Sequence, residues 1–437
     1  MLRATYKASE DGVLMANYLE QQKIKWRVLL PLLAILVLDV AGFGLVIPLL
    51  KPLFFNPHTS IIHPQTSETL RHLYYGLALA LYPMAIVIAT PLFGVLSDRI
   101  GRKKVLLGSL LISSIALLLC ALSLSVQSVS LLLIGRFMAG FSSSSRTVAQ
   151  AAIADISTNK SKAMYLSLIA AALTVGMVVG PLLGGIFSNE NLLQQFNLST
   201  PFLITAVLFF IAAIFFGLIF TETCDKAAQK VWTWQENIQQ CFGIFKNLQI
   251  IIMLAVFICL EIAWSLYFQT SPLMLARLFE YDATLIGFYT AFLGASMSLG
   301  LLIVFRLIIR YVSLSNTAFT GALLAAIGFI GTALVSNVYL YWLFAIPMTM
   351  GVGITYTALV TLISNAAGKD LQGWIMGLLA ALLSLAWMST GFLSSFIVAI
   401  NPVLPILLAA IIMLFASGLF FVIHVAEFFV AAKESSV

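Results

Sequence analysis

The sequence predicts an all-α membrane protein in which twelve transmembrane helices form two six-helix bundles. Of its 437 residues, 61% are hydrophobic and only 9% carry a charge, whereas soluble domains carry about 25% charged residues. The apolar residues gather in runs of the roughly 20 residues that a helix needs to cross a bilayer. A polar segment, 222–247, divides these runs into two sets of six. A soluble fold is therefore excluded.

Twelve runs qualify as spans, because a helix satisfies its own backbone polar groups within the bilayer. In order they are 28–50, 73–96, 105–126, 129–153, 163–187, 201–221, 248–270, 284–308, 316–336, 339–363, 372–398 and 402–425. The predicted parts of the chain are a tail (1–27), an N-terminal bundle (28–221), the linker (222–247), a C-terminal bundle (248–425) and a second tail (426–437). The first tail is polar and precedes an overlong apolar run, which argues against a cleavable signal.

The lysines and arginines orient these spans. Eighteen of the 23 fall in the tails, the linker and the loops on the same side, and three fall in the opposite loops. Short loops rich in Lys and Arg stay in the cytoplasm, so both chain ends are predicted to be cytoplasmic. The net charge of +6 follows this pattern and indicates membrane topology, not nucleic-acid binding.

The longest predicted outer loop, 51–72, contains three of the four histidines: His58, His63 and His72. Three histidines suggest a metal site or a pH sensor. Their spacing matches no standard ligand pattern, and the four cysteines show no metal or redox spacing. We therefore predict no metal and no cofactor, and the histidines stay without an assigned role.

The connection between the second and third spans is short and highly charged. It contains Asp98, Arg99, Arg102, Lys103 and Lys104. The string Gly94-x-Leu96-x-Asp98-Arg99-x-Gly101-Arg102-Lys103 resembles, at every position, the signature between the second and third helices of the major facilitator superfamily. A positive-inside loop alone would explain the cations but neither the acid nor the glycines. The resemblance implies the major facilitator fold and transport by alternating access.

Four charged side chains lie well inside predicted spans, away from the span ends, where each costs at least about 2.5–3.5 kcal/mol and marks a functional site by default. They are Asp39, Arg136, Arg146 and Glu261. Asp39 and Glu261 lie at similar depths, near the midplane of the first and seventh spans. If a pseudo-twofold axis relates the halves, both carboxyl groups face one central cavity. Removal from water favours a protonated carboxyl group, so either acid is predicted to load and release a proton. The alternative is a structural ion pair, such as Asp39 with Arg136.

The residues around Asp39 narrow the resemblance. The string Leu38-Asp39-x-x-Gly42-x-Gly44-Leu45-x-x-Pro48 is similar to the first-helix motif of the tetracycline-efflux branch of twelve-helix drug:proton antiporters. In that branch the matching acid takes part in substrate and proton handling, and the resemblance implies this role for Asp39. Gly42 and Gly44 permit close helix approach, and Pro48 can open the helix near its outer end.

The fourth span contains a second motif. Gly135-Arg136-Phe137-Met138-Ala139-Gly140 resembles the family motif in which an arginine assists proton transfer, which implies that role for Arg136. A positive charge there would help a nearby carboxyl group to discharge its proton. Arg146 follows a run of serines, Ser142–Ser145, and the resemblance does not explain it. Arg146 either pairs with an acid or binds an anionic substrate.

The fourth span ends in Ala152-Ile153-Ala154-Asp155, again as in the tetracycline branch. Asp155 is placed to meet Arg102, while Asp98 is placed to interact with the positive N-terminus of another helix, which we expect to be the eleventh. Contacts that differ between two states can latch the cytoplasmic side shut. The predicted gating residues are Gly94, Asp98, Arg99, Gly101, Arg102 and Asp155.

In the fifth span, Gly176-x-x-x-Gly180-Pro181-x-x-Gly184-Gly185 resembles the family's antiporter signature, which is found mainly in exporters. It favours export over uptake. Small residues four apart also allow tight helix crossing, so ordinary packing is the alternative explanation. The predicted helix-packing residues are Gly42, Gly44, Pro48, Gly176, Gly180, Pro181, Gly184 and Gly185.

Polar and aromatic side chains near the acids are the predicted substrate contacts, because aromatic rings offer drug-like molecules apolar contact and stacking. The predicted substrate-binding residues are Asp39, Tyr82, Arg146, Glu261, Trp264, Tyr267, Gln269, Tyr356, Asn365 and Trp387. The predicted proton-coupling residues are Asp39, Glu261 and Arg136. In the tetracycline branch a glutamine tends to follow Tyr82 by one turn. This chain has Ile86 there, which argues against tetracycline itself.

Together these features predict a secondary active transporter, a proton-coupled antiporter that exports a small amphipathic, drug-like compound. The alternative within the fold is a transporter of a specific metabolite or siderophore, including by uptake. A membrane enzyme or a non-transporting membrane protein is not predicted, because the sequence shows no nucleophile cluster and the loop signature would have no purpose. The predicted partners are a small-molecule substrate, protons and the lipid bilayer, with no nucleic acid. The chain is predicted to be a monomer in the bacterial inner membrane.

Overall fold

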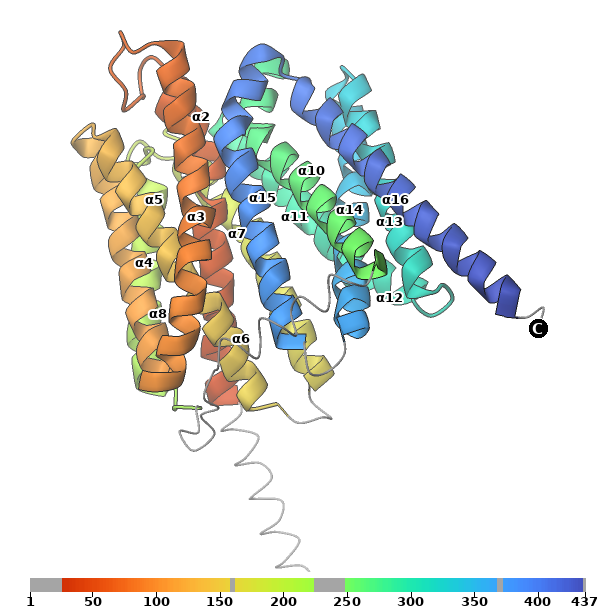
Figure 1. The fold of residues 1–437 in the computed structure, drawn as a ribbon. Coiled ribbons are helices and arrows are strands. Elements are labelled where there is room, and N and C mark those ends of the chain that lie inside the picture. The colour runs from red at the N-terminus through yellow and green to blue at the C-terminus, as the bar shows by residue number, and fades with distance from the viewer. Residues whose placement is uncertain (1–25, 158–161, 224–247, 368–371, 435–437) are drawn as a thin grey trace, which may run out of the picture.

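The computed structural model describes residues 26–157, 162–223, 248–367 and 372–434. Within these ranges the regular structure is helical and no strand occurs. Eleven helices are long and apolar enough to cross a membrane. The fourth predicted span is present as two shorter helices joined end to end. The predicted all-α fold of twelve spans is confirmed (Figure 1).

The N-terminal half begins with a helix at residues 26–44, which has no label in Figure 1. It continues with α2 (Ile47–Phe55), α3 (Glu68–Ile100), α4 (Arg102–Ser125), α5 (Val129–Ser143), α6 (Ser145–Asp155), α7 (Lys162–Phe187) and α8 (Thr200–Ile219). The C-terminal half contains α10 (Leu248–Leu278), α11 (Ala283–Leu299), a π-helical turn (Gly300–Val304), α12 (Phe305–Ile308), α13 (Leu314–Leu334), α14 (Val338–Ala367), α15 (Gln372–Ile400) and α16 (Leu404–Glu434). Most of the predicted linker, 224–247, lies outside the described residues, so the predicted bundle boundaries stay a prediction.

The first span is interrupted near its end. A turn at Leu45 and Val46 separates residues 26–44 from α2, and Pro48 lies in the first turn of α2. Proline has no N–H group and its ring clashes with the carbonyl group four residues earlier, so a helix accepts it best in its first turn. The interruption lies where Pro48 is expected to open the helix.

The fourth span is interrupted at Ser144, although no proline lies there. The hydroxyl groups of Ser142 and Thr147 donate to the main-chain oxygens of Ala139 and Ser144, at 2.9 and 2.8 Å. Side-chain bonds of this kind compete with the helical hydrogen-bond ladder and bend helices. The fourth span is therefore divided into α5 and α6, with Ser144 between them.

Glycines bring several helices into backbone contact. A Cβ atom on Gly180 of α7 would lie 2.5 Å from the main-chain oxygen of Ala41 in the first helix. Likewise, a Cβ atom on Gly287 of α11 would lie 2.9 Å from the Cα atom of Gly185 of α7. Carbon atoms in contact are normally about 3.5–4.0 Å apart, so no larger residue fits at either place. The α7 glycines that face the first helix are Gly176, Gly180 and Gly184.

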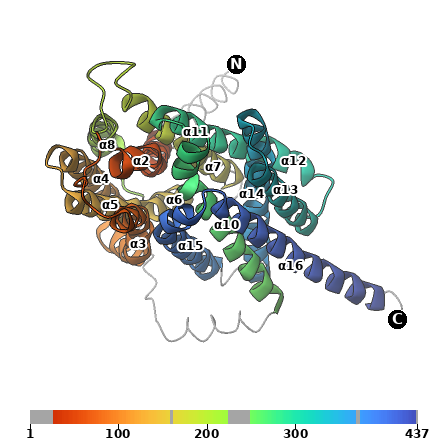
Figure 2. The ribbon, with the colours of Figure 1, turned by 90° about the horizontal axis from the view of Figure 1, so that it is seen from above.

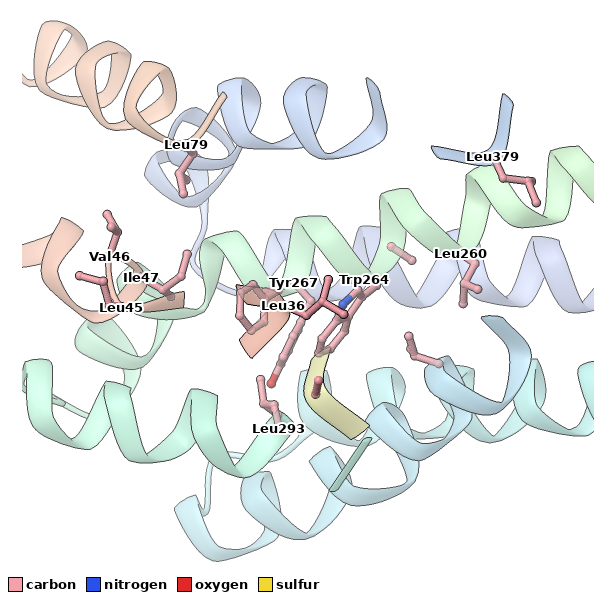
Figure 3. Packing of buried hydrophobic residues seen from close by; sticks show 14 of the residues in the cluster. Leu36, Leu45, Val46, Ile47, Leu79, Leu260, Trp264, Tyr267, Leu293 and Leu379 are labelled. Atoms are coloured by element: carbon pink, nitrogen blue, oxygen red, sulfur yellow. The ribbon is translucent and has the colours of Figure 1, made fainter. Parts of the chain in front are cut away.

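The two halves of the chain meet along two pairs of helices. Viewed from above, α3 lies beside α15 and α7 lies beside α11 (Figure 2). The α2 helix also contacts α10 and α11. Buried apolar side chains of both halves belong to one cluster. Figure 3 shows part of it, with Leu36 and Leu79 from the N-terminal half and Leu260 and Trp264 from α10.

The two ends of the molecule differ in composition. At one end α3 turns into α4 through Gly101, whose φ of 99° strongly favours glycine. We call this the basic end, because Arg99, Arg102, Lys103 and Lys104 lie there. At the opposite end, residues 56–67 connect α2 to α3 and contain His58 and His63. We call this the histidine end.

Candidate functional site

Asp39 of the first helix forms a buried ion pair with Arg146 of α6. Its Oδ2 atom accepts a hydrogen bond from Nε of Arg146 at 2.8 Å, and Nη2 of Arg146 lies 2.8 Å from the same atom. The Asp39 side chain is 5% exposed, whereas that of Arg146 is 33% exposed. The partner of Asp39 is thus Arg146, and the pairing of Asp39 with Arg136 offered as the structural alternative is wrong. Of the two roles left open for Arg146, the structure shows the pairing with an acid.

Arg136 of α5 is a buried cation without an acidic partner among the described residues. Its Nε donates to the main-chain oxygen of Ala78 at 2.9 Å, while Nη2 has no hydrogen-bond partner. Its Cζ atom lies 4.9 Å from the ring centroid of Tyr82 and 5.9 Å from that of Phe43. Aromatic faces attract cations and partly replace lost hydration. The positive charge of Arg136 is therefore stabilised by the Phe43 and Tyr82 rings and not by a carboxylate.

Glu261 of α10 is as deeply buried as Asp39, at 4% exposed, but its partner is neutral. Its Oε2 accepts a hydrogen bond from the indole Nε1 of Trp387 in α15 at 3.0 Å. No lysine or arginine in the described part of the chain forms an ion pair with it. The two midplane acids therefore have different surroundings.

A series of aromatic rings joins the surroundings of the two acids across the contact between the halves. Trp387 packs edge-on against Phe43 of the first helix at 5.5 Å and lies 5.8 Å from Phe268 of α10. Phe43 in turn lies 5.0 Å from Tyr82, and Phe268 lies 5.4 Å from Trp264. Sequence analysis missed Phe43 and Phe268. Phe43 follows Asp39 by four residues and Phe268 follows Glu261 by seven, so helical spacing could have indicated both.

Several predicted substrate contacts lie in this group. The hydroxyl group of Tyr82 hydrogen-bonds Ser143 at 2.6 Å, beside the interruption of the fourth span. Tyr356 lies within electrostatic range of both Arg146 and Glu261. Gln269 donates from Nε2 to the main-chain oxygen of Trp387 at 3.1 Å, and its buried Oε1 has no partner.

Two predicted substrate contacts lie elsewhere. The hydroxyl group of Tyr267 hydrogen-bonds Tyr289 and Tyr341, both of the C-terminal half, in a fully buried cluster. Figure 3 shows Tyr267 beside Trp264 on α10. Asn365 is exposed in the last turn of α14. The structure therefore does not place Asn365 with the acids, and it commits the Tyr267 hydroxyl group to a packing cluster.

A cavity of about 10 Å³ adjoins Asp39. It is lined by Asp39, Gly42, Tyr82, Ser113, Leu117, Ala139 and Phe209. This volume is about that needed for one water molecule, whereas a drug-sized ligand needs several hundred Å³. For such a ligand to bind between the acids, the halves would have to separate.

The basic end contains a second group of charges. Arg102 bridges Asp98, at 2.8 Å, and Asp155, at 3.3 Å. Glu222, just beyond α8, accepts hydrogen bonds from the main-chain N–H groups of Arg102 at 2.9 Å and Lys103 at 3.0 Å. It thereby caps the start of α4. Asp155 and Arg102 thus meet as expected, whereas sequence analysis missed the Glu222 cap.

Asp98 was expected to interact with the N-terminus of the eleventh span. That span is α15, and the residues just before it, 368–371, lie outside the described part of the chain. The expectation therefore stays a prediction. Among the described residues, no group of three or more His, Cys, Asp or Glu side chains could hold a metal ion.

Comparisons of the sequence with a family model and with known proteins agree on one family. The sequence model of the Major Facilitator Superfamily matches residues 32–391. The chain is 29% identical to the class C tetracycline resistance protein of Escherichia coli over 82% of this chain and 86% of that protein. It is 30% identical to the class H protein of Pasteurella multocida over 60% of this chain and 62% of that protein. It is also 31% identical to the multidrug resistance protein MdtG of Proteus mirabilis, over 49% of each chain.

Solved structures agree on the fold. The human organic anion transporter MFSD10 (TETRAN) superposes with a TM-score of 0.68 at 17% identity, covering 91% of this chain and 99% of that one. A bacterial homologue of the human lysosomal transporter Spinster, in an inward-facing and unoccupied conformation, gives a TM-score of 0.71 at 15% identity, covering 92% and 96%. At these identities the likeness establishes architecture alone.

Proposed function

This chain belongs to the Major Facilitator Superfamily, and we propose that it is a proton-coupled antiporter that exports a small amphipathic compound by alternating access. The observation that carries the proposal is Glu261, a buried acid at the contact between the halves whose partner is an indole and not a cation. Relatives named as tetracycline and multidrug resistance proteins support export of a drug-like molecule. The proposal assigns transport to the chain and no enzymatic chemistry.

In this proposal the basic end faces the cytoplasm and the histidine end faces outward, because short loops rich in Lys and Arg resist translocation. The protein would lie as a monomer in the bacterial inner membrane. Arg102, with Asp98 and Asp155, would latch the cytoplasmic side during part of the cycle. The Glu222 cap supports this role, because it fixes the start of α4 beside the latch.

Glu261 is proposed to carry the coupling proton. A carboxyl group that has neither water nor a cation beside it is most stable with its proton bound, and the closed site provides neither. When the halves separate and water enters, the ionised form is solvated and the proton can leave. Proton binding is then tied to conformation, as coupled transport requires.

Asp39 and Arg146 are proposed to respond to substrate. Their mutual attraction offsets the loss of hydration of both groups. A substrate with a polar or charged group would compete for one member of the pair. The ring series from Tyr82 through Phe43 to Trp387 offers the apolar part of an amphipathic substrate stacking contacts. The alternative is a specific metabolite or siderophore carried by the same pair, including by uptake.

The experiment uses purified protein in liposomes that enclose a pH-sensitive dye, screened with amphipathic drugs and small metabolites. Wild type is compared with Glu261→Gln, Asp39→Asn and the control Glu190→Gln, which neutralises an exposed acid between α7 and α8. We expect a transported compound to move protons in wild type and in the control but not in Glu261→Gln. Substrate flux that ignores both the proton gradient and Glu261→Gln would rule out the proposed coupling and leave a facilitator.

A further inference from the structure

A buried histidine joins the two halves at the histidine end. The Nδ1 atom of His72, in the second turn of α3, hydrogen-bonds the hydroxyl group of Ser395 in α15. His72 is 4% exposed and Ser395 is fully buried, whereas His58 and His63 are exposed. The sequence places all three histidines in one segment, but the structure takes only His72 into the contact between the halves.

The surroundings of His72 are tightly packed. Its ring lies 4.8 Å from that of Phe55 in α2 and 6.2 Å from that of Phe396 in α15. One turn further along α3, a Cβ atom on Gly76 would lie 2.5 Å from the main-chain oxygen of Phe392 in α15. Helices α2, α3 and α15 therefore meet around the imidazole with no room for a hydration shell.

A second contact between the halves lies three residues after His72 in α3. The hydroxyl group of Tyr75 donates to the main-chain oxygen of Gln269 in α10 at 3.2 Å. On the other side of the molecule, Asn189 after α7 donates to Thr284 of α11 at 2.9 Å. Both pairs join the N-terminal half to the C-terminal half. The histidine end is thus held shut along both contacts between the halves, and His72 belongs to this closure with a side chain whose type titrates near neutral pH.

The charges that face His72 are unequal. From α10, Arg277 acts on it as a neighbouring positive charge and itself donates to the main-chain oxygen of Val398 in α15 at 2.8 Å. From its own helix, Glu68 is the opposing negative charge, and it is exposed. The adjacent Arg71 is turned toward the loop, where it donates to main-chain oxygens including that of Phe54 at 2.9 Å. The contacts from α2 and α15 are Phe55, Ser395 and Phe396, none of which carries a charge.

We propose that His72 is a second proton-binding site, separate from the midplane acids. The contacts between the halves at the histidine end form an outer gate, which stays closed while the His72 ring is neutral and opens when the ring is protonated from outside. A neutral imidazole completes the contact with Ser395. A proton would make the buried ring a cation near the exposed cation Arg277, without water to solvate the ring, and opening the gate would relieve this by hydrating the ring. Imidazole in water titrates near pH ~6.5, so acid outside would favour the open gate. The exporter would then open outward most readily when protons are available to drive it.

This inference rests on the proposed orientation, in which the histidine end faces outward, but not on transport itself. Gate opening is therefore measured directly. Spin labels at Thr69→Cys and Ile400→Cys, both exposed at the histidine end of α3 and α15, report the separation of the halves by electron–electron resonance. All native cysteines are replaced by serine. Glu261→Gln and Asp39→Asn are also present, so that the midplane acids do not contribute.

Between pH ~8 and ~5.5 we expect the ratio of open to closed molecules to rise by about threefold or more, because acid favours the state in which His72 binds a proton more tightly. His72→Gln keeps a hydrogen-bonding side chain without the titration, and should remove the pH response. His63→Gln, an exposed histidine in the same segment, should retain it. A distance distribution at pH ~8 that matches the parent shows that each variant is folded.

Retention of the pH response in His72→Gln overturns the proposal, and so does the absence of a response in the parent. Failure of the proposed transport function is distinguishable, because it would appear in the liposome assay and leave this distance measurement unchanged. Transport without a His72-dependent response would support the proposed export function and overturn the proposed role of His72 in the outer gate.

Discussion

Asp39 and Glu261 are two acids that are buried to a similar extent, yet they differ in the groups that contact their carboxylates. Asp39 accepts a hydrogen bond from Nε of Arg146 and forms an ion pair with its guanidinium group. Glu261 receives one from the neutral indole of Trp387. An acid paired with a cation can stay ionised out of water, whereas an acid without one needs a proton or a cationic ligand. The difference agrees with the proposed roles, in which Asp39 responds to substrate and Glu261 carries the proton.

The strongest test of this comparison is Glu261→Gln. We expect proton movement driven by a transported compound to fall to the level of protein-free liposomes, because no other midplane acid lacks a cation. Thermal stability should be retained, because glutamine still accepts the hydrogen bond from Trp387. Asp39→Asn should behave differently and lower the melting temperature, since it leaves Arg146 without its partner. Equal effects of the two substitutions on stability would remove the distinction between the acids.

Arg146→Gln tests the paired side. Removal of one member of a buried ion pair leaves an uncompensated charge, and we expect a loss of about 2–4 kcal/mol in the free energy of unfolding, reduced because Arg146 is partly exposed. The double variant Asp39→Asn/Arg146→Gln should recover most of this loss. Thermal unfolding in detergent measures both, with Lys104→Gln as a control for loss of an exposed cation. A single variant as stable as wild type would show that the pair contributes little.

Trp387→Phe tests the unpaired side. Phenylalanine keeps ring contacts with Phe43 and Phe268 but cannot donate to Glu261, so we expect a loss of about 1–2 kcal/mol in stability. Trp264→Phe is the matched control, because its indole forms no hydrogen bond among the described residues. The difference between the two melting temperatures isolates the hydrogen bond. Identical losses would mean that packing alone accounts for Trp387.

The smallest expected effect is that of Phe43→Leu, which removes the ring between the two sites. An aromatic pair contributes about 0.5–1.5 kcal/mol beyond its buried area, so we expect affinity for an aromatic substrate to fall about two- to tenfold. Binding is measured by titration of the transported compound. Phe210→Leu, at an exposed position of α8, should leave affinity unchanged. An equal loss of affinity for an aliphatic substrate would show that the Phe43 ring acts through packing.

Most of the fold was predictable from the sequence, whereas the pairing within the site was not. Apolar runs and loop charges depend on local composition, which is why the twelve spans and the meeting of Arg102 with Asp155 were expected. Asp39 and Arg146 are 107 positions apart, and their contact depends on how the first helix and α6 pack in the folded protein. Hydropathy averaged over a span carries no information on this packing. It therefore cannot show which arginine of the fourth span faces Asp39.

The contact of Glu261 with Trp387 joins residues 126 positions apart. It was not predictable for the same reason, although each residue was chosen separately for its type. Phe43 is a different case, since its spacing from Asp39 was sufficient to select it. The capping role of Glu222 was not predictable either, because it depends on the position of α4.

The contact of Gly185 with Gly287 has a mechanical consequence. Where side chains interdigitate, two helices can turn against each other only if many rotamers change together. These two glycines place backbone against backbone between the halves, so no rotamers have to change there before one helix turns on the other. The α7–α11 contact is thus suited to be a pivot once the hydrogen bond from Asn189 to Thr284 at the histidine end has broken.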